Sequence, residues 1–283
     1  DYRQMFQTTD LSGNPEVLWY KQYDGDQIGN NVNRYLNQGG GSVGVTASLV
    51  DDYLTIDGKP FVGDERIEAK KVFGNELQPT LRDPRLSQTV CMPGQQLRPD
   101  DKAPYYVVPP LIGTSSYNQN MTGYSLLKHV QIDYTGSLDA EFKGATPAIQ
   151  FRYADILLNY AEAAFELGLK DQALQKVNEV RKRAGIKEKN SLTMDDIRNE
   201  RRVELAFENL RYWDLVRWRV ASKVMNNTTF SALIPWLDYK TKKYVFEKSV
   251  NTLNLPKTFL DKQYYLEIPG VAQNDLLEQN PGY

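Results

Sequence analysis

Three glutamates at four-residue steps are the residues of this sequence whose types and spacing most resemble a chemical site. They are Glu200, Glu204 and Glu208. On one helix this spacing places the three carboxylates on the same face, where like charges repel. Two kinds of chemistry use such carboxylates, namely a di-metal centre and the acid and base of a glycosidase.

Both chemical interpretations lack a partner in the sequence. A di-metal bundle site uses Glu-x-x-His repeats, and the single histidine, His129, stands in the other half of the chain. A glycosidase opposes two carboxyl groups across roughly 5 to 10 Å, whereas side chains on one helical face project in the same direction. We therefore expect arginines to neutralise the glutamates and to hold helix to helix. The candidates are Arg181, Arg183, Arg201, Arg202, Arg211, Arg217 and Arg219.

Composition and motifs argue against several other functions. The sequence contains no Gly-x-Ser-x-Gly, Gly-x-x-x-x-Gly-Lys-Ser/Thr or His-Glu-x-x-His motif. Cys91 is the single cysteine, so no disulfide or zinc cluster of cysteines forms within this chain. A formal net charge of -2 with interleaved acids and bases argues against nucleic-acid binding. We expect no catalytic residues, no cofactor and no metal site.

Aromatic side chains in the loops are better candidates for a binding site. The sequence has 18 tyrosines and 4 tryptophans, and several stand in polar, turn-rich stretches without core periodicity. These are Trp19, Tyr20, Tyr23, Tyr35, Tyr105, Tyr106, Tyr117, Trp236 and Tyr239. A sugar ring has an apolar face and a rim of hydroxyls, which aromatic rings beside amides and arginines suit; the alternative for each ring is to fill space beneath a loop. The candidate ligand-binding residues are Tyr23, Arg34, Tyr35 and Trp236.

The elements that must position these residues change character near residue 146. Residues 1–146 are rich in turn formers, and we expect this loop-rich segment to face the ligand. It is predicted to contain short strands at 16–20, 105–108 and 127–132 and a short helix at 45–53. Residues 147–283 are predicted to contain helices at about 151–167, 171–184, 193–210 and 212–225, followed by an irregular C-terminal tail.

Capping signals define how the long helices are joined. Gly168 is a stop signal for the first, Asp171 can cap the second, and Gly185 ends it. The connection is so short that these two helices must pack antiparallel. Thr193 and Asp196 resemble a capping box at the start of the third helix. The predicted fold class is all-α, a helical-repeat (TPR-like) scaffold with a large loop-rich segment and a few short β-strands.

The helical half resembles the SusD/RagB family over residues 152–163, 177–185, 200–208 and 211–218. The ending Gln279-Asn280-Pro281-Gly282-Tyr283 and the stretches 49–53, 57–60 and 82–85 are also similar to that family. The resemblance covers effectively the whole chain. It implies structural roles, holding helices together, for Arg152, Glu162, Arg181, Glu200, Arg201, Glu204 and Asp214.

The resemblance also implies a role that spacing does not show. Members are lipoproteins on the outer membrane of Bacteroidota, and they cover a SusC-like TonB-dependent transporter that imports oligosaccharides, or peptides in some branches. Members are also about twice this length, so we expect a preceding part that holds the lipidated cysteine and further repeats. Membrane contact would then occur only through a lipid anchor absent from this chain.

The function expected from the sequence is therefore cell-surface glycan binding for nutrient uptake, without catalysis. Two alternatives stay open. One is a soluble glycoside hydrolase that uses paired carboxylates, and the other is a TPR-like adaptor that binds protein.

Overall fold

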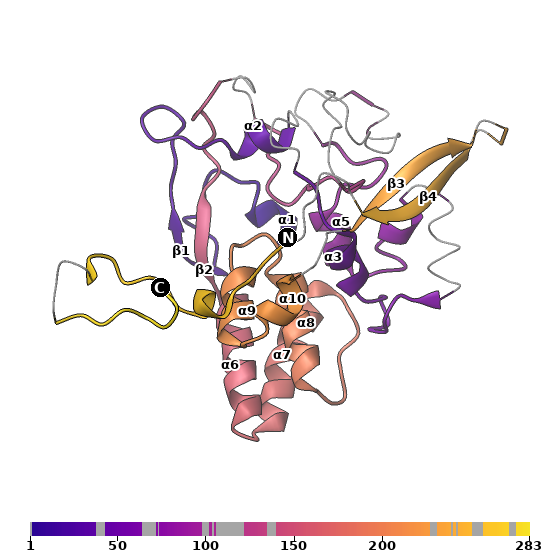
Figure 1. Ribbon diagram of the computed structural model, residues 1–283. Coiled ribbons are helices and arrows are strands. Elements are labelled where there is room, and N and C mark those ends of the chain that lie inside the picture. Colours follow the sequence, from indigo (N-terminus) through magenta and orange to yellow (C-terminus); the bar gives the residue numbers. More distant parts are fainter. Residues whose placement is uncertain are drawn as a thin grey trace.

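The long helices of the second half form the lower part of the molecule, and the short elements of the first half lie above them (Figure 1). The computed structural model describes residues 2–37, 43–63, 72, 74–97, 102–103, 105, 122–134, 140–226, 231–238, 240–241, 243–250, 257–271 and 276–283. For residues 37, 231–237 and 243–250 it describes the backbone. The fold is mostly helical with a few short strands, as the sequence predicts.

The helices and strands are named here in chain order. They are α1 (Tyr2–Met5), β1 (Val17–Lys21), α2 (Val32–Asn37), α3 (Ala47–Asp52), η1 (Asn75–Leu77), α5 (Pro84–Thr89), β2 (Ala148–Arg152), α6 (Tyr153–Glu166), α7 (Lys170–Ala184), α8 (Met194–Glu204), α9 (Arg211–Arg217), α10 (Ala221–Met225), β3 (Ser231–Asp238), β4 (Lys243–Val250) and η2 (Asp261–Tyr264). In the described part of the chain, no helix is long and apolar enough to cross a membrane.

Helices α6 and α7 form the antiparallel hairpin that the sequence predicts (Figure 1). Gly168 and Gly185 have φ angles of 77° and 78°, a left-handed backbone that stops each helix. The cap predicted at Asp171 is wrong. Leu169 is the N-cap residue of α7 and makes no side-chain bond, and Asp171 lies in the first turn, where its negative charge suits the helix dipole. Apolar side chains of α6, α7 and α8 close the core of this part, which contains Leu157, Leu158, Ala161, Val177, Val180, Ile197 and Leu205.

Helix α8 begins as predicted but ends early. The capping box of Thr193 and Asp196 is confirmed, with both reciprocal bonds present. The helix stops at Glu204 rather than at residue 210, because Phe207 and Asn209 adopt φ angles of 63° and 65°, which an α-helix does not contain. The single helix predicted at 212–225 is likewise two, α9 and α10, separated where Arg219 has a φ of 57°.

The loop-rich half contains fewer strands than expected. The strand predicted at 16–20 is confirmed as β1, which pairs antiparallel with β2. Strand β2 takes the residues that were expected to begin the first long helix, so α6 starts only at Tyr153. The strand predicted at 127–132 is wrong, because residues 128 and 129 form a turn. Of the strand predicted at 105–108, Tyr105 lies in a turn and the rest falls outside the described residues.

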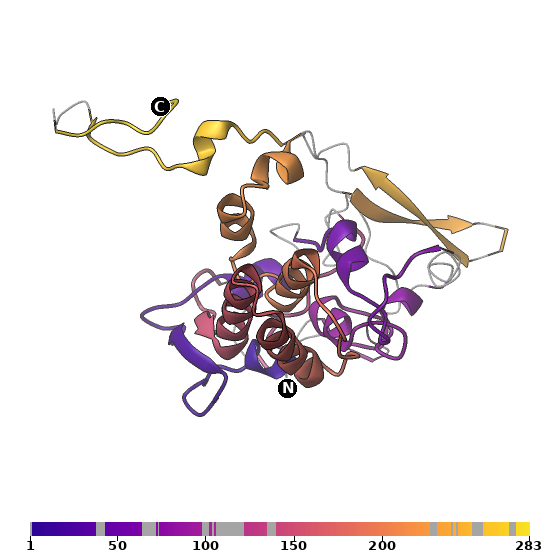
Figure 2. The same cartoon turned by 90° about the horizontal axis from the view of Figure 1, so that it is seen from below.

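Two further predictions concern short elements. The helix expected at 45–53 is confirmed as α3, and the Thr46 hydroxyl accepts a hydrogen bond from the Leu49 amide at its start. The tail after residue 226 was expected to be irregular, but it contains the hairpin of β3 and β4, paired from Ser231 with Val250 to Asp238 with Lys243. Seen from below, this hairpin and the C-terminal segment extend from the helical centre on opposite sides (Figure 2).

Candidate functional site

The glutamates of α8 lie at the centre of a buried ion network. The Glu204 side chain is fully buried, and its carboxylate meets Arg85 and Arg152 at 2.7 Å each, together with Arg183. Burial alone would raise the pKa of Glu204, but the three arginines outweigh it and hold that pKa well below its ordinary value. Glu200 is shared in the same way between Arg85 and Arg181, at 2.7 Å each.

Glu208 lies beyond the end of the helix and joins the network from the loop. One carboxylate oxygen is 2.7 Å from Lys128 Nζ, and the other is 2.6 Å from Arg152 Nε. Burial would raise the pKa of Glu208, but Arg152 and Lys128 outweigh it and lower that pKa. Glu208 also borders a surface hollow, yet both of its oxygens are held by cations. It is therefore poorly placed to act as a general acid or base.

These contacts decide how the three glutamates are used. Cations lie within 2.7 Å of the oxygens of all three glutamates, and charge-assisted bonds tie α8 to α5, β2 and α7. In the described ranges, no cluster of three or more His, Cys, Asp or Glu side chains could hold a metal ion. The expectation that Arg181 and Arg183 cross to the glutamates is confirmed, whereas Arg85 and Lys128, both from the loop-rich half, were not anticipated.

Two of the four predicted ligand residues come together on one hollow. Tyr23 follows β1 and Tyr35 stands on α2, and both line a hollow of about 450 Å³. The side chain of Asn30 joins the start of α2 to the segment before β2, because it donates to the Thr146 carbonyl at 2.8 Å and accepts from the Val32 amide at 3.1 Å. The Lys21 ammonium lies 5.1 Å from the centre of the Tyr23 ring.

The remaining wall of this hollow combines amides with apolar groups. Gln150 and Asn209 contribute amide side chains, and Phe207 contributes a ring that is 37% exposed. The Tyr35 side chain is 44% exposed, so its ring is available to a ligand. We call this surface the Tyr23–Tyr35 hollow. Rings beside amides and hydroxyls on a concave surface are what a sugar requires.

The other two predicted ligand residues lie elsewhere. Arg34 forms an exposed ion pair with Glu141 and is not among the residues that line the hollow. Trp236 lies on β3, where its backbone pairs with Val245, and its side chain falls outside the described residues. Both assignments stay predictions. Of the other loop aromatics, Trp19 stacks on Phe151 with the ring centres 5.8 Å apart, while Tyr106, Tyr117 and Tyr239 are outside the described residues.

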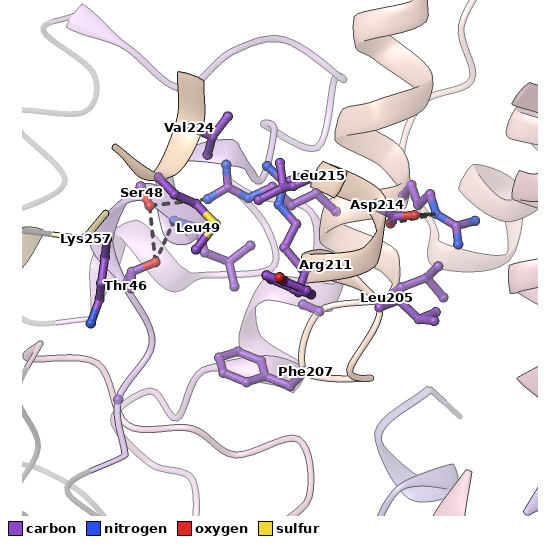
Figure 3. Close-up of a pocket in the computed structure, with 17 residues that line it drawn as sticks. Thr46, Ser48, Leu49, Leu205, Phe207, Arg211, Asp214, Leu215, Val224 and Lys257 are labelled. Atoms are coloured by element: carbon purple, nitrogen blue, oxygen red, sulfur yellow. Dashed lines mark hydrogen bonds and ion pairs between the residues drawn. The ribbon is translucent and has the colours of Figure 1, made fainter. Parts of the chain in front are cut away.

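A second concavity, of about 510 Å³, lies between α3, the loop after α8, and the α9–α10 pair. We call it the Arg211 pocket. Figure 3 shows Thr46, Ser48 and Lys257 on one side, Arg211 and Leu215 across from them, and Phe207 and Val224 at the two remaining edges. Apolar groups cover most of its wall, and these belong to Leu49, Leu205, Ala206, Phe207, Leu210, Tyr212, Leu215, Val224 and Met225.

Phe207 borders both concavities, a position that the sequence does not predict. It falls inside a stretch with helical periodicity, so it was expected to continue α8. From the sequence, Arg211 is expected as a partner for glutamates and Tyr212 as the start of a helix, and both belong to a stretch that resembles the SusD/RagB family, but neither is expected at a binding surface. Their roles depend on the break after Glu204, for which the sequence carries no recognisable signal such as a glycine.

Comparison with known proteins identifies similarity along nearly the whole chain. The model of the SusD family matches residues 15–283. Among curated proteins, SusD-like protein P38 of Formosa agariphila is 37% identical over 111 residues, which are 35% of this chain and 21% of that protein. A SusD-like protein of Bacteroides ovatus is 35% identical over 123 residues, which are 42% of this chain and 22% of that protein.

Solved structures with the same fold extend beyond this chain. A SusD-like protein of Bacteroides fragilis has a TM-score of 0.74 and 26% identity, covering 100% of this chain and 57% of the solved one. A SusD-like carbohydrate binding protein of the same species has a TM-score of 0.66 and 22% identity, covering 96% of this chain and 56% of the solved one. At this identity the similarity establishes a shared fold. This chain thus spans little more than half the length of the solved proteins that it matches.

Proposed function

Because this chain belongs to the SusD family, we propose that it binds oligosaccharides at the cell surface and that the Tyr23–Tyr35 hollow is part of the binding site. The observation that carries the proposal is the convergence of two tyrosines, from separate segments of the loop-rich half, on one concave surface. The loop-rich residues 1–146 would then face the ligand. Solved proteins of this fold include a carbohydrate binding protein and surface glycan-binding proteins, which supports the same ligand class.

The hollow suits capture of a sugar better than its cleavage. Stacking on Tyr35 and hydrogen bonds to Gln150 and Asn209 need no proton transfer. The acid that borders the hollow, Glu208, is held ionised by Lys128 and Arg152, whereas a glycosidase acid must keep its proton near neutral pH. We propose accordingly that the protein binds without catalysis.

The location and partner complete the proposal. We propose that the protein is an outer-membrane lipoprotein and hands its ligand to a SusC-like TonB-dependent transporter. In support, the chain belongs to the SusD family, and a surface glycan-binding protein of Bacteroides fluxus shares its fold with a TM-score of 0.60 at 19% identity.

Affinity electrophoresis and calorimetry against neutral oligosaccharides test the binding site. Tyr35→Ala should weaken binding of the bound glycan by about 1–3 kcal/mol, as loss of a stacking platform does. Tyr160→Ala is the matched control, because Tyr160 is also a helical tyrosine and is 46% exposed, against 44% for Tyr35, but does not line the hollow. Equal affinities for wild type, Tyr35→Ala and Tyr23→Ala would refute the site.

The same panel separates the alternatives. Release of reducing ends from any glycan, abolished by Glu208→Gln, would support a glycoside hydrolase. Failure to bind any glycan, together with capture of a defined peptide, would support a protein-binding adaptor. The expected result is glycan binding with the glycan recovered intact.

A further inference from the structure

Arg211 is a cation without a close partner at the wall of an apolar pocket. It is half-buried at the start of α9, and its side chain makes no hydrogen bond or ion pair with the described residues. Its guanidinium carbon lies 6.0 Å from the centre of the Trp218 ring. Asp52 and Asp214 act on it only through longer-range attraction.

The acids near Arg211 are already taken by other arginines. Asp214 receives two bonds from Arg201 Nε, at 2.8 and 2.9 Å, and one from Arg217 at 2.9 Å. Asp52 is paired with Arg202 at 2.5 Å. Burial and repulsion by Arg202 lower the pKa of Arg211 to about 10, so the guanidinium stays charged at neutral pH. It therefore gains from any anion that enters the pocket.

The rest of the Arg211 pocket adds aromatic surface. Arg202, which is paired with Asp52, and Lys257 line the same space, while Arg201 and Asp214 face each other and cancel. Figure 3 shows the bonds of Asp214 directed away from Thr46 and Lys257. The rings of Phe207 and Tyr212 are 37% and 40% exposed. A ligand for this pocket thus needs an anionic group and an apolar face.

We infer that the Arg211 pocket is a binding site for an anionic sugar, in which Arg211 holds the carboxylate of a uronate or the sulfate of a sulfated residue. The inference rests on the proposed function in taking the ligand to be a glycan, and it adds a second subsite and an acidic ligand class. Guanidinium binds carboxylate and sulfate oxygens with two parallel bonds, and the C–H face of the sugar packs on Tyr212 or Phe207. A volume of about 510 Å³ lies within the range of roughly 300–1,000 Å³ usual for small-molecule sites.

Calorimetry with tetragalacturonate tests the inference. Arg211→Gln should weaken its binding roughly 10-fold or more, as loss of a charge-assisted pair does, and Arg211→Lys should retain part of the affinity. Arg219→Gln is the matched control, because it removes the same charge from an exposed arginine that does not line the pocket. Since Arg211 has no ion pair to lose, Arg211→Gln should unfold at the same urea concentration as wild type.

The choice of probes separates the sources of the anion and the two proposals. A sulfated oligosaccharide and its desulfated form test sulfate against carboxylate, and Arg211-dependent binding of either acidic sugar supports the inference. Equal affinity of wild type and Arg211→Gln for both, or equally Arg211-dependent binding of tetraglutamate, overturns it. If neutral glycans bind through Tyr35 and acidic ones do not bind, the inference about the Arg211 pocket is refuted and the proposed function stands. If acidic glycans bind through Arg211 and neutral ones do not bind, the proposed role of the Tyr23–Tyr35 hollow is refuted alone. If neither class binds, both are refuted.

Discussion

Glu204→Gln is the substitution that most directly tests the buried ion network. The change removes one negative charge from a fully buried position while keeping the volume of the side chain. Three arginines lose a shared partner, but Arg85 keeps Asp83 at 2.6 Å and Arg152 keeps Glu208 at 2.6 Å. Breaking a buried pair by removing one partner costs about 3–5 kcal/mol. Because the arginines keep other partners, we expect Glu204→Gln to lower the free energy of unfolding by about 3 kcal/mol.

Urea unfolding followed by circular dichroism measures this loss, with Glu179→Gln as the control. Glu179 pairs with Lys176 at 3.1 Å and is 40% exposed, so its loss should change the free energy of unfolding by less than about 0.5 kcal/mol. The m-value should stay constant in both variants, because neither changes the surface exposed on unfolding. A Glu204→Gln protein as stable as the Glu179→Gln protein would refute the structural role of the network.

The same variant should change the acid stability of the protein. The folded-state pKa of Glu204 is held well below its ordinary value of 4.5. Its contribution is therefore complete above pH 4.5 and is lost as the pH falls below that value, where the unfolded state takes up the proton first. Stability of Glu204→Gln should accordingly fall less steeply than that of wild type as the pH falls below 4.5.

Two further measurements test the surroundings of His129 and of Asn209, which both line the Tyr23–Tyr35 hollow. Burial and the neighbouring Lys128 lower the pKa of His129 to about 4. His129 is the single histidine, so its imidazole signals in NMR should show one titration well below pH 6. A midpoint near 6.5 would contradict the structure. Asn209 has a φ of 65°, so Asn209→Gly should leave stability unchanged or raise it, whereas Asn209→Ala should cost about 1 kcal/mol; the reverse order in thermal unfolding would exclude a left-handed backbone there.

The elements that the sequence predicts well are those with local causes. Apolar periodicity, two glycines and the Thr193 capping box define α6, α7 and the start of α8. The end of α8 has a distant cause. Lys128 Nζ donates to the Ala206 carbonyl at 2.7 Å, and Arg152 donates to the Glu204 carbonyl at 2.9 Å. Those contacts come from other parts of the chain, so periodicity alone extended the helix too far.

The candidate site likewise contains residues that the sequence predicts and residues that it does not. Tyr23 and Tyr35 could be selected because rings in polar turns lack a core explanation, and the structure places them on one hollow. Arg211 could not be selected, because a sequence does not reveal which of several neighbouring arginines is left without an acid. Asp52, from the loop-rich half, pairs with Arg202, and Asp214 pairs with Arg201, so Arg211 is left without an acid of its own among the described arginines that line the pocket.

The ion network and the two proposed binding surfaces meet in the loop after α8. Lys128 holds the carbonyl of Ala206 and the carboxylate of Glu208, and the next residue, His129, donates to the Phe207 carbonyl at 3.1 Å. These bonds hold Phe207 in a left-handed conformation that is costly for a bulky residue, and its ring stands between the Tyr23–Tyr35 hollow and the Arg211 pocket. A loosened network would let this backbone relax and would move a wall shared by both surfaces. Variants such as Glu204→Gln should therefore weaken ligand binding through the position of Phe207, even where they remain folded and touch no ligand.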